Sequence, residues 1–382
     1  MTFVSPTAPA SYTWEATDEE VAARYDIAQD RIVRFDLNTS PSPPELIAGL
    51  LASGSFETSL SEYPPADYRR LVAAAADRFG VGTDELMVGA GADEILDIIG
   101  KAFLPEGSRT VIPTPTYAMY RVITEQRGAT VIAVPRLGRD AGYVLDAPAV
   151  RAAARDAALV WLCSPNNPTA LPEPDGAIAA LLADLAADAA SSDREAPVVV
   201  LDEAYAEFVG DSLVGLRNDY PRLIVVRTAS KAYALAGLRV GFAVARSALI
   251  ETLNPYRSPA SVSTVSATLV AEALRDGSAA AGNVARVTRE RDRLRAALNG
   301  AGWSVGPSVT NFLLVDFASS ERAAEAAQGL LRAGLVPRTF GPNHPLADHL
   351  RLTVRDPGEN DRLIEAARSI TPTLPDVLEA LR

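Results

Sequence analysis

Two kinds of hydrophobic pattern alternate between about residue 42 and residue 258 of this 382-residue chain. Short apolar runs, rich in β-branched residues, are separated by stretches in which apolar residues recur every three or four positions. The first pattern is typical of buried strands and the second of amphipathic helices. The apolar runs lie at 110–112, 130–134, 159–163, 198–201, 223–226 and 240–245. This alternation predicts an α/β fold with a mainly parallel central sheet and helices on both faces.

The pattern changes on either side of this region. The first forty residues are rich in Pro, Ser and Thr, with a short helical stretch near 18–25. After about residue 258 we expect a long helix at 285–298, strands at 312–315 and 349–354, a helix at 322–332 and a final helix. A chain of this length usually forms more than one core. We therefore predict an N-terminal arm (1–41), a large domain (42–258) and a smaller α+β C-terminal domain (259–382).

Polar residues follow three of the predicted strands. In a mainly parallel sheet, ligand sites collect at the carboxyl ends of the strands. Singly, each of these residues has an ordinary explanation as a helix cap or a turn residue. Together they supply a carboxylate, a phenol, an amide, two hydroxyls and an amine: Asp202, Tyr205, Asn167, Thr228, Ser230 and Lys231.

The amine stands out because only two of the 36 basic residues are lysines, Lys101 and Lys231. Arginine replaces lysine as a surface cation, but it stays protonated and cannot act as a nucleophile. The apolar spacing of 95–103 puts Lys101 on the solvent face of a helix. Lys231 follows a buried strand, so it is the candidate nucleophile.

These groups fit the needs of pyridoxal 5'-phosphate, which requires a lysine, a carboxylate for the pyridine nitrogen, donors to the ring hydroxyl and a phosphate cradle. The glycine-rich stretch 89–94 begins the helix at 93–103, where free backbone N–H groups can bind a phosphate. Arg239 can add a bidentate contact to the same phosphate. Tyr117, after the strand at 110–112, either stacks on the cofactor ring or belongs to the core.

Composition limits the partners, the cellular location and the metal sites that we expect for this protein. A net charge of −12 without any basic run disfavours a nucleic-acid partner. No apolar stretch is long enough for a membrane span, and the N-terminus lacks a secretion signal. The single Cys163 excludes an internal disulfide and suits a reducing compartment, so we expect a cytoplasmic protein. His344 and His349 are too few for a zinc site, and we expect both in a surface loop and no metal.

Six motifs carry a resemblance to a known family. They are Gly-Ala-Asp-Glu (91–94), Pro-Thr-Tyr (115–117), Cys-Ser-Pro-Asn-Asn-Pro-Thr (163–169), Asp-Glu-Ala-Tyr-Ala-Glu-Phe (202–208), Ser-Lys-Ala-Tyr-Ala-Leu-Ala-Gly-Leu-Arg (230–239) and Leu-Arg-Leu-Thr (350–353). From about Asp36 to the last helix the chain resembles the fold-type I pyridoxal-phosphate-dependent aminotransferases, and within them the histidinol-phosphate aminotransferase family.

The resemblance implies a role for each cofactor residue. Lys231 carries the cofactor and moves the proton, Asp202 pairs with the pyridine nitrogen, Asn167 and Tyr205 bond the ring hydroxyl, and Tyr117 stacks. The phosphate is implied to be held by the backbone at Ala92 and Asp93 together with Thr228, Ser230 and Arg239. Tyr63 matches a tyrosine that reaches this phosphate from the neighbouring subunit, which implies a homodimer with shared active sites.

The substrate residues follow from the same resemblance. Arg351 matches the arginine that binds the substrate α-carboxylate, and Arg338 the one offered to the phosphate of histidinol phosphate. Asn38 lies in an N-terminal stretch that departs from the family's Asn-rich pattern. Ala170 replaces the glycine that usually closes its turn, so we expect that turn to avoid a strained backbone.

The implied activity is amino transfer from histidinol phosphate to 2-oxoglutarate in histidine biosynthesis. One alternative is an aminotransferase of the same subfamily acting on aromatic or other amino acids. A threonine-phosphate decarboxylase uses the same cofactor residues, but its glycine-rich N-terminal signature is missing here.

Overall fold

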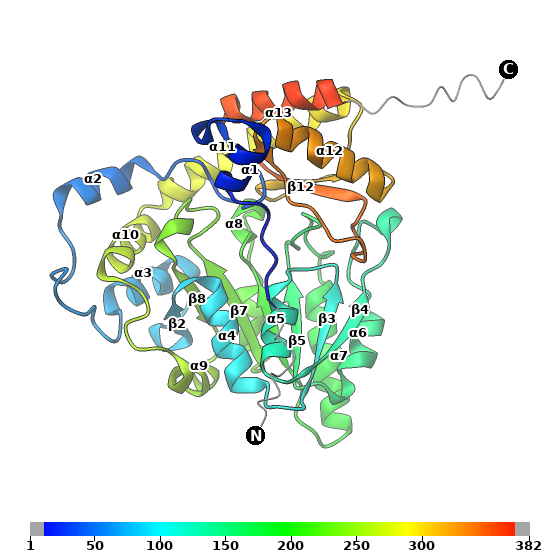
Figure 1. Ribbon diagram of the computed structural model, residues 1–382. Helices are drawn as coiled ribbons and strands as arrows, with labels where there is room; N and C mark the ends of the chain where they lie inside the picture. The colour runs from blue at the N-terminus through cyan, green and yellow to red at the C-terminus, as the bar shows by residue number, and fades with distance from the viewer. Residues whose placement is uncertain (1–10, 371–382) are drawn as a thin grey trace, which may run out of the picture. The chain divides into compact units, whose positions relative to one another are not determined.

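The computed structural model describes residues 11–370 and divides the chain into two compact units (Figure 1). The first unit contains residues 39–285 and the described residues up to Thr13. The second contains residues 14–38 together with the chain from Arg286 onward. Part of the expected N-terminal arm therefore packs within the second unit, while residues 259–285 stay with the first.

The helices and strands are as follows. In the first unit the helices are α2 (Glu45–Ser53), α3 (Arg69–Phe79), α4 (Gly91–Phe103), α5 (Met119–Gln126), α6 (Ala147–Ala153), α7 (Ala177–Ser191), α8 (Ala206–Val209), α9 (Ser247–Leu253) and α10 (Thr264–Arg275). Its strands are β2 (Leu86–Gly89), β3 (Arg109–Thr114), β4 (Thr130–Pro135), β5 (Leu159–Cys163), β6 (Val198–Asp202), β7 (Leu223–Thr228) and β8 (Gly241–Val244). Helix α11 (Gly277–Gly300) contains the boundary between the units. The second unit holds α1 (Asp18–Tyr25), α12 (Ser320–Arg332), α13 (Pro357–Ile370), β1 (Val33–Arg34), β9 (Ser304–Val305), β10 (Phe312–Asp316), β11 (Leu335–Val336) and β12 (His349–Thr353).

The central sheet has the order β2-β8-β7-β6-β5-β3-β4. Strands β3 to β7 are parallel to their neighbours within this set, and β8 is antiparallel to both β2 and β7. The predicted mainly parallel sheet is therefore confirmed. Strand β2 was absent from the predicted set, and the predicted run at 240–245 is the antiparallel β8.

Both faces of this sheet are buried, because every residue of β5, β6 and β7 is covered. Side chains alternate between faces along a strand. Trp161, Cys163 and Val200 lie in one core cluster with α4, α5 and α9. Val199 points the other way, toward Leu182 of α7. The helices thus form layers on both faces, as predicted.

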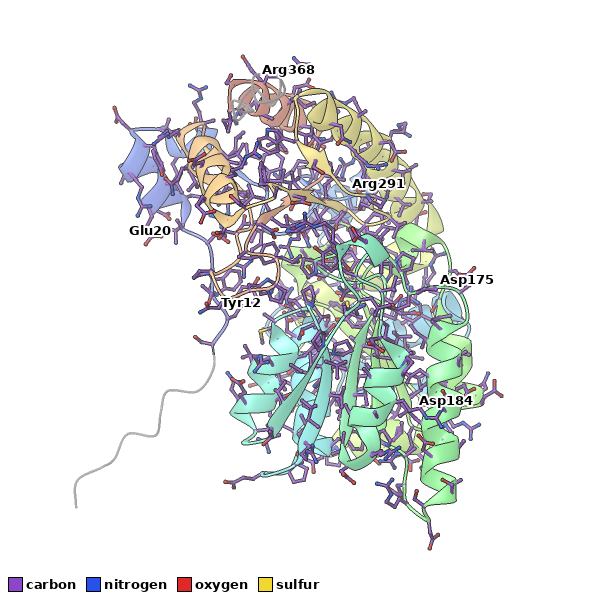
Figure 2. The ribbon with its side chains drawn as sticks, turned by 90° about the vertical axis from the view of Figure 1, so that its right-hand side faces the viewer. Tyr12, Glu20, Asp175, Asp184, Arg291 and Arg368 are labelled. Carbon is purple, nitrogen blue, oxygen red and sulfur yellow. The ribbon has the colours of Figure 1, made fainter. Side chains whose placement is uncertain are left out.

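Helix α7 is an alanine-rich apolar stretch, and it is one of the helices that cover the central sheet. Leu181, Leu182 and Leu185 are buried. Asp184 points outward (Figure 2) and pairs with Arg151 of α6 at 3.1 Å. An amphipathic helix of this kind covers a sheet with one side and meets solvent with the other. Within residues 11–370, no helix combines the length and hydropathy that crossing a bilayer requires.

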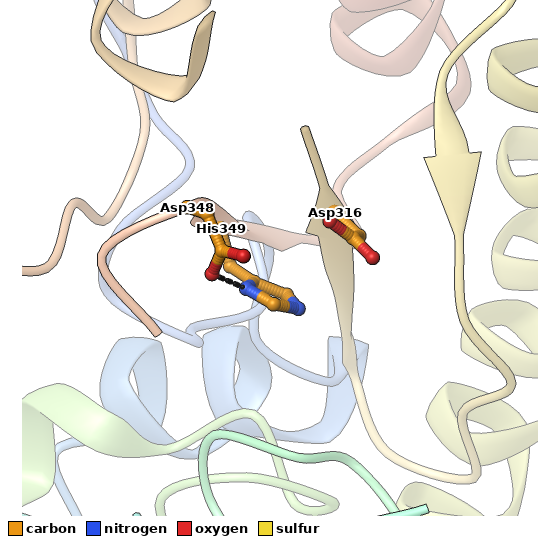
Figure 3. A group of neighbouring side chains, drawn as sticks. All are labelled: Asp316, Asp348 and His349. Carbon is orange, nitrogen blue, oxygen red and sulfur yellow. Dashed lines mark hydrogen bonds and ion pairs between the residues drawn. The ribbon is translucent and has the colours of Figure 1, made fainter. Parts of the chain in front are cut away.

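The second unit is built around the antiparallel sheet β12-β10-β9 and the parallel pair β1-β11. The expectation that His349 belongs to a surface loop is wrong, because it begins β12 opposite Asp316 of β10 and is 3% exposed. Its Nδ1 lies 2.5 Å from Asp348 Oδ1, and Asp316 completes the group (Figure 3). Burial of the ring is compensated by this carboxylate, as a buried polar group requires.

Candidate active site

The predicted carboxylate lies at the carboxyl end of the central sheet. Asp202 is the last residue of β6, and its Cα is paired with Cys163 of β5 and Val226 of β7. It shares its face of the sheet with Val198 and Val200, because side chains on a strand alternate with period two. The side chain therefore points toward the layer of α4 and α5, and the residue is only 4% exposed.

Each carboxylate oxygen of Asp202 accepts a hydrogen bond. The backbone N–H of Ala204 donates to Oδ1 at 3.0 Å, and the phenol of Tyr120 donates to Oδ2 at 2.7 Å. Burial raises the pKa of Asp202 to about 6, and the bonds from Tyr120 and Ala204 act in the opposite direction. The carboxyl is therefore ionised at neutral pH, but by a narrow margin.

The amine and the phenol lie beside this carboxylate. Lys231 Nζ is 5.9 Å from the centre of the Tyr205 ring, and Tyr205 is 3% exposed at the start of α8. The positive charge of Lys231 also lowers the pKa of Asp202. Three residues predicted from the ends of two neighbouring strands, β6 and β7, are thus neighbours in the first unit.

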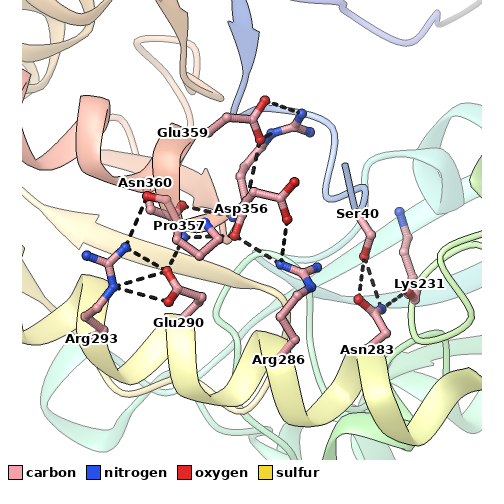
Figure 4. Close-up of polar contacts among 11 residues, drawn as sticks. Ser40, Lys231, Asn283, Arg286, Glu290, Arg293, Asp356, Pro357, Glu359 and Asn360 are labelled. Carbon is pink, nitrogen blue, oxygen red and sulfur yellow. Dashed lines mark hydrogen bonds and ion pairs between the residues drawn. The ribbon is translucent and has the colours of Figure 1, made fainter. Parts of the chain in front are cut away.

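The backbone at Lys231 is held by a residue that the sequence did not indicate. Asn283, on α11, donates from Nδ2 to the carbonyl oxygen of Lys231 at 3.3 Å (Figure 4). It also donates to the carbonyl oxygen of Ala232 at 2.9 Å. The same amide is hydrogen bonded to the Ser40 hydroxyl. The segment that carries the amine is therefore anchored by Asn283, which is itself held by Ser40.

The residues predicted to hold the phosphate lie at the N-terminus of α4. Gly91 has a positive φ of 87°, and the N-cap Ala90 caps the helix with no side-chain hydrogen bond. Asp93 in the first turn accepts from Tyr117 at 2.9 Å and pairs with Arg239 at 3.3 Å. Backbone N–H groups at such an end, with a guanidinium beside them, suit a phosphate.

Two hydroxyls predicted for the same cradle lie together at the end of β7. Thr228 Oγ1 is 3.0 Å from Ser230 Oγ and also accepts from the backbone N–H of Ser230 at 3.1 Å. Both residues are buried. The donor set of this corner is therefore made of N–H groups, hydroxyls and one guanidinium, which is the chemistry of an anion site.

A glycine missed by the sequence interpretation determines how closely these parts approach. Gly241 begins β8 and pairs with both Gly89 of β2 and Thr228 of β7. A Cβ at this position would overlap the backbone at Gly91 and Ala92, lying 2.7 Å from the Gly91 carbonyl oxygen. A glycine inside a strand often marks such a close backbone approach, and this was the available signal.

Replacing Gly241 with alanine is expected to displace the start of α4. Overpacking of this kind lowers the free energy of unfolding by about 1–3 kcal/mol. The Ala92 N–H is one of the groups predicted to hold the cofactor phosphate, so its displacement should raise the dissociation constant for pyridoxal phosphate roughly tenfold or more. Equilibrium dialysis and chemical denaturation measure the two effects. The matched control is Gly237→Ala, where nothing lies within 4 Å of the added methyl; equal losses in both variants would contradict this role of Gly241.

The loop after β5 brings Asn167 to the same edge of the sheet, where it is 8% exposed. Its neighbour Asn166 ties this loop to the one after β3, donating to the Pro115 carbonyl at 3.1 Å and accepting from Thr116 at 2.8 Å. The expectation that the turn at Ala170 avoids strain is wrong. Ala170 is fully buried with a φ of 67°, a left-handed conformation that glycine adopts more readily.

Tyr63 is not part of this cluster. It lies between α2 and α3 of the first unit and is 87% exposed. The three predicted substrate residues, Asn38, Arg338 and Arg351, all belong to the second unit.

Within the second unit these three residues are close to one another. Arg338 and Arg351 form an antiparallel bridge, with backbone hydrogen bonds of 3.0 Å in both directions. Arg351 donates to the carbonyl of Asp36, two residues before Asn38. The Asn38 backbone N–H donates to Thr353 of β12 at 2.9 Å. The structure thus brings the backbones of Arg338 and Arg351 together beside β12, while the Arg338 guanidinium pairs with Glu15 at 3.6 Å.

The first-unit cluster fits pyridoxal phosphate by its chemistry. An amine lies next to a buried, doubly hydrogen-bonded carboxylate. Tyr117 donates to Asp93 at the predicted anion cradle and packs edge-on against Tyr120, which donates to that carboxylate. Together with a mainly parallel sheet that carries these groups at one edge, the cluster defines an enzyme of the pyridoxal-phosphate-dependent class.

Comparison with known proteins gives the family. Residues 43–366 match the model of the aminotransferase class I and II family. The chain is 36% identical to histidinol-phosphate aminotransferase of Thermococcus gammatolerans, over 88% of this chain and 92% of that protein. It is 39% identical to the enzyme of the same name from Xanthomonas campestris pv. campestris, over 81% and 85%. The chain belongs to the class I and II aminotransferases.

The fold agrees with this assignment. The structure of histidinol-phosphate aminotransferase from Sinorhizobium meliloti in complex with pyridoxal-5'-phosphate superposes with a TM-score of 0.82, at 24% identity, covering 94% of this chain and 95% of that one. The predicted aminotransferase and its fold type are therefore confirmed.

Proposed function

We propose that this aminotransferase moves the amino group of histidinol phosphate to 2-oxoglutarate, a reaction of histidine biosynthesis. The observation that carries the proposal is the similarity to histidinol-phosphate aminotransferases, at 34–39% identity over 81–92% of the chain. We infer that pyridoxal phosphate is the cofactor, supported by the donor set of the first unit.

Bound pyridoxal phosphate supplies an electron sink for charge developing at the substrate α-carbon. Lys231 holds the cofactor through its amine and then moves the proton to and from that carbon as general acid and base. Asp202 would hold the proton on the pyridine nitrogen, while Asn167 and Tyr205 would donate to the ring oxygen. Tyr117 would lie against the ring. The N–H groups of α4, with Thr228, Ser230 and Arg239, would hold the phosphate.

The two arginines of the second unit are proposed to bind the anionic ends of the substrates. Arg351 takes the α-carboxylate of the 2-oxo acid, and Arg338 takes the phosphate of the amino donor. A guanidinium group suits such anions because it binds them in bidentate fashion. Asn38, whose backbone joins the same group, is proposed to line the substrate site.

We also propose a homodimer in which Tyr63 of the partner subunit reaches the cofactor phosphate. The segment around it exposes large apolar side chains, with Leu60 at 68% and Leu51 at 50% exposure. Exposed apolar side chains gathered in one segment favour burial against another chain. The single buried Cys163 agrees with a cytoplasmic enzyme.

The substrate is tested with a panel of amino donors in single-turnover half-reactions. Histidinol phosphate is expected to give the highest kcat/KM, above aromatic amino acids and threonine phosphate. A higher kcat/KM with an aromatic amino acid would replace the proposed donor, and release of carbon dioxide from threonine phosphate would indicate a decarboxylase.

Replacing Arg338 with alanine is expected to lower kcat/KM for histidinol phosphate roughly 10- to 100-fold, because a charge-assisted contact to the phosphate is lost. Turnover of an aromatic donor, which carries no phosphate, should change far less. The matched control is Arg332→Ala, an exposed arginine on α12 of the same unit. Unchanged histidinol-phosphate turnover in the Arg338 variant would show that the phosphate binds elsewhere.

A further inference from the structure

We propose that Tyr120 is a positioning residue, which acts on the cofactor only through Asp202 by donating the hydrogen bond that keeps this carboxylate ionised and correctly oriented. The inference rests on the proposed function, because it assumes that Asp202 faces the pyridine nitrogen. It assigns a task in the reaction to a buried phenol outside the set of residues that the resemblance implies for the cofactor.

The ring of Tyr120 is fixed on several sides. It is fully buried on α5, stacked on Trp161 with 5.3 Å between ring centres, and edge-on to Tyr117 at 5.7 Å. Thr124 joins the same packing, accepting from Trp161 Nε1 at 3.3 Å and donating to the Tyr120 carbonyl at 2.7 Å. The hydroxyl is therefore held at one place, 2.7 Å from Asp202 Oδ2.

The direction of this hydrogen bond is set by burial. Burial, together with the nearby charge of Asp202, raises the pKa of Tyr120 well above its ordinary value. The phenol consequently keeps its proton and acts as a donor. Asp202 then has one donor on each oxygen, Tyr120 from α5 and the Ala204 N–H from its own segment. Neither oxygen can turn away without losing a bond.

The other groups around Asp202 do not replace this donor. Asp93 on α4 raises the pKa of Asp202, and Lys231 after β7 lowers it. Cys163 on β5 stays a neutral thiol, because burial raises its pKa to about 12. Without the phenol proton, the buried carboxylate would keep only the Ala204 N–H and the field of Lys231. It would then hold a proton to higher pH, and a protonated carboxyl cannot pair with the pyridinium.

The test uses Tyr120→Phe, which keeps the ring and removes only the hydroxyl. The probe is pyridoxal phosphate, and its dissociation constant is measured by equilibrium dialysis between pH 5 and pH 9 on the full chain. In the variant we expect binding to weaken roughly 10- to 100-fold at neutral pH, and the pH at which affinity is lost to move upward. Titration of the free cofactor is common to both proteins, so the difference reports on the protein.

Two further variants separate positioning from packing. Trp161→Phe disturbs the stacking but leaves the Tyr120 phenol. The pH at which this variant loses affinity for pyridoxal phosphate should therefore match the wild type. In an Asp202→Asn background, adding Tyr120→Phe should change cofactor affinity no further, because the carboxylate through which Tyr120 acts is gone. A wild-type pH profile in Tyr120→Phe, or additive losses in the double variant, would overturn the inference. Failure of the wild type to bind pyridoxal phosphate would instead overturn the proposed function.

Discussion

Replacing Lys231 with alanine is expected to lower the rate of amino transfer by at least about 10⁴-fold. The amine is proposed to hold the cofactor and to move the proton at the reacting carbon, and no neighbouring group of the first-unit cluster can do both. The visible absorption band of lysine-bound cofactor should disappear as well. Because Lys231 is only partly buried, the free energy of unfolding should change little.

The matched control is the only other lysine in the sequence. Lys101 forms a surface ion pair with Asp97 at 2.6 Å, one turn away on α4. Such pairs contribute little, so Lys101→Ala should leave both rate and absorption unchanged. A Lys231→Ala protein that keeps the visible band would show that the cofactor is bound elsewhere.

Replacing Asp202 with asparagine is expected to lower kcat/KM roughly 10³-fold, because a neutral amide cannot hold the proton on the pyridine nitrogen. The hydrogen bonds of the site can persist, since an amide oxygen accepts from Ala204 and an amide N–H can donate to the Tyr120 oxygen. The loss of activity should therefore occur without loss of the fold.

The same substitution should make the cofactor-free protein more stable above pH 6. The pKa of Asp202 is raised from its ordinary 3.8 to about 6, so the unfolded chain releases this proton at lower pH than the folded protein does. Stability then falls as the pH rises from 3.8 to 6, by up to about 3 kcal/mol. Chemical denaturation at pH 5 and pH 8 measures the free energy of unfolding of both proteins. The stability that Asp202→Asn adds should be larger at pH 8 than at pH 5. A variant less stable than the wild type at both pH values would contradict the view that ionised Asp202 destabilises the fold.

The parts of the site that lie at strand ends could be predicted from the sequence. Strands β5, β6 and β7 are continuous apolar runs because both faces of a parallel sheet are covered. The residues after such runs must meet at one edge, which is why Asp202, Tyr205 and Lys231 could be grouped. Their separate roles came from the family motifs, since spacing alone left ordinary caps and turns as alternatives.

The residues that support the site could not be found in this way. Tyr120 meets Asp202 across 82 positions of sequence, and Asn283 meets Lys231 across 52. Both contacts depend on how helices pack on the sheet, which local patterns do not report. Gly241 has no space for a side chain only because α4 begins beside it. The left-handed turn at Ala170 is likewise imposed by its surroundings, against the preference of alanine.

The division of the chain shows the same limit. Residues 14–38 have the composition of an arm, yet β1 pairs in parallel with β11, and Thr353 donates to the Phe35 carbonyl at 2.7 Å. Pairing over some 300 residues leaves no local signature in a two-residue strand. Local hydrophobic periodicity could predict α1 and β12, but not that they would belong to one unit.

The other proposals depend on Lys231 binding pyridoxal phosphate. Because the sequence has only two lysines, the lysine that carries the cofactor can be identified directly. The protein is loaded with the cofactor, reduced with borohydride to make the bond permanent, digested and examined by mass spectrometry. We expect one phosphopyridoxyl group per chain, on the peptide that contains Lys231, with Lys101 unmodified. Modification of Lys101 instead, or a Lys231 peptide that remains unmodified after loading, would contradict this expectation.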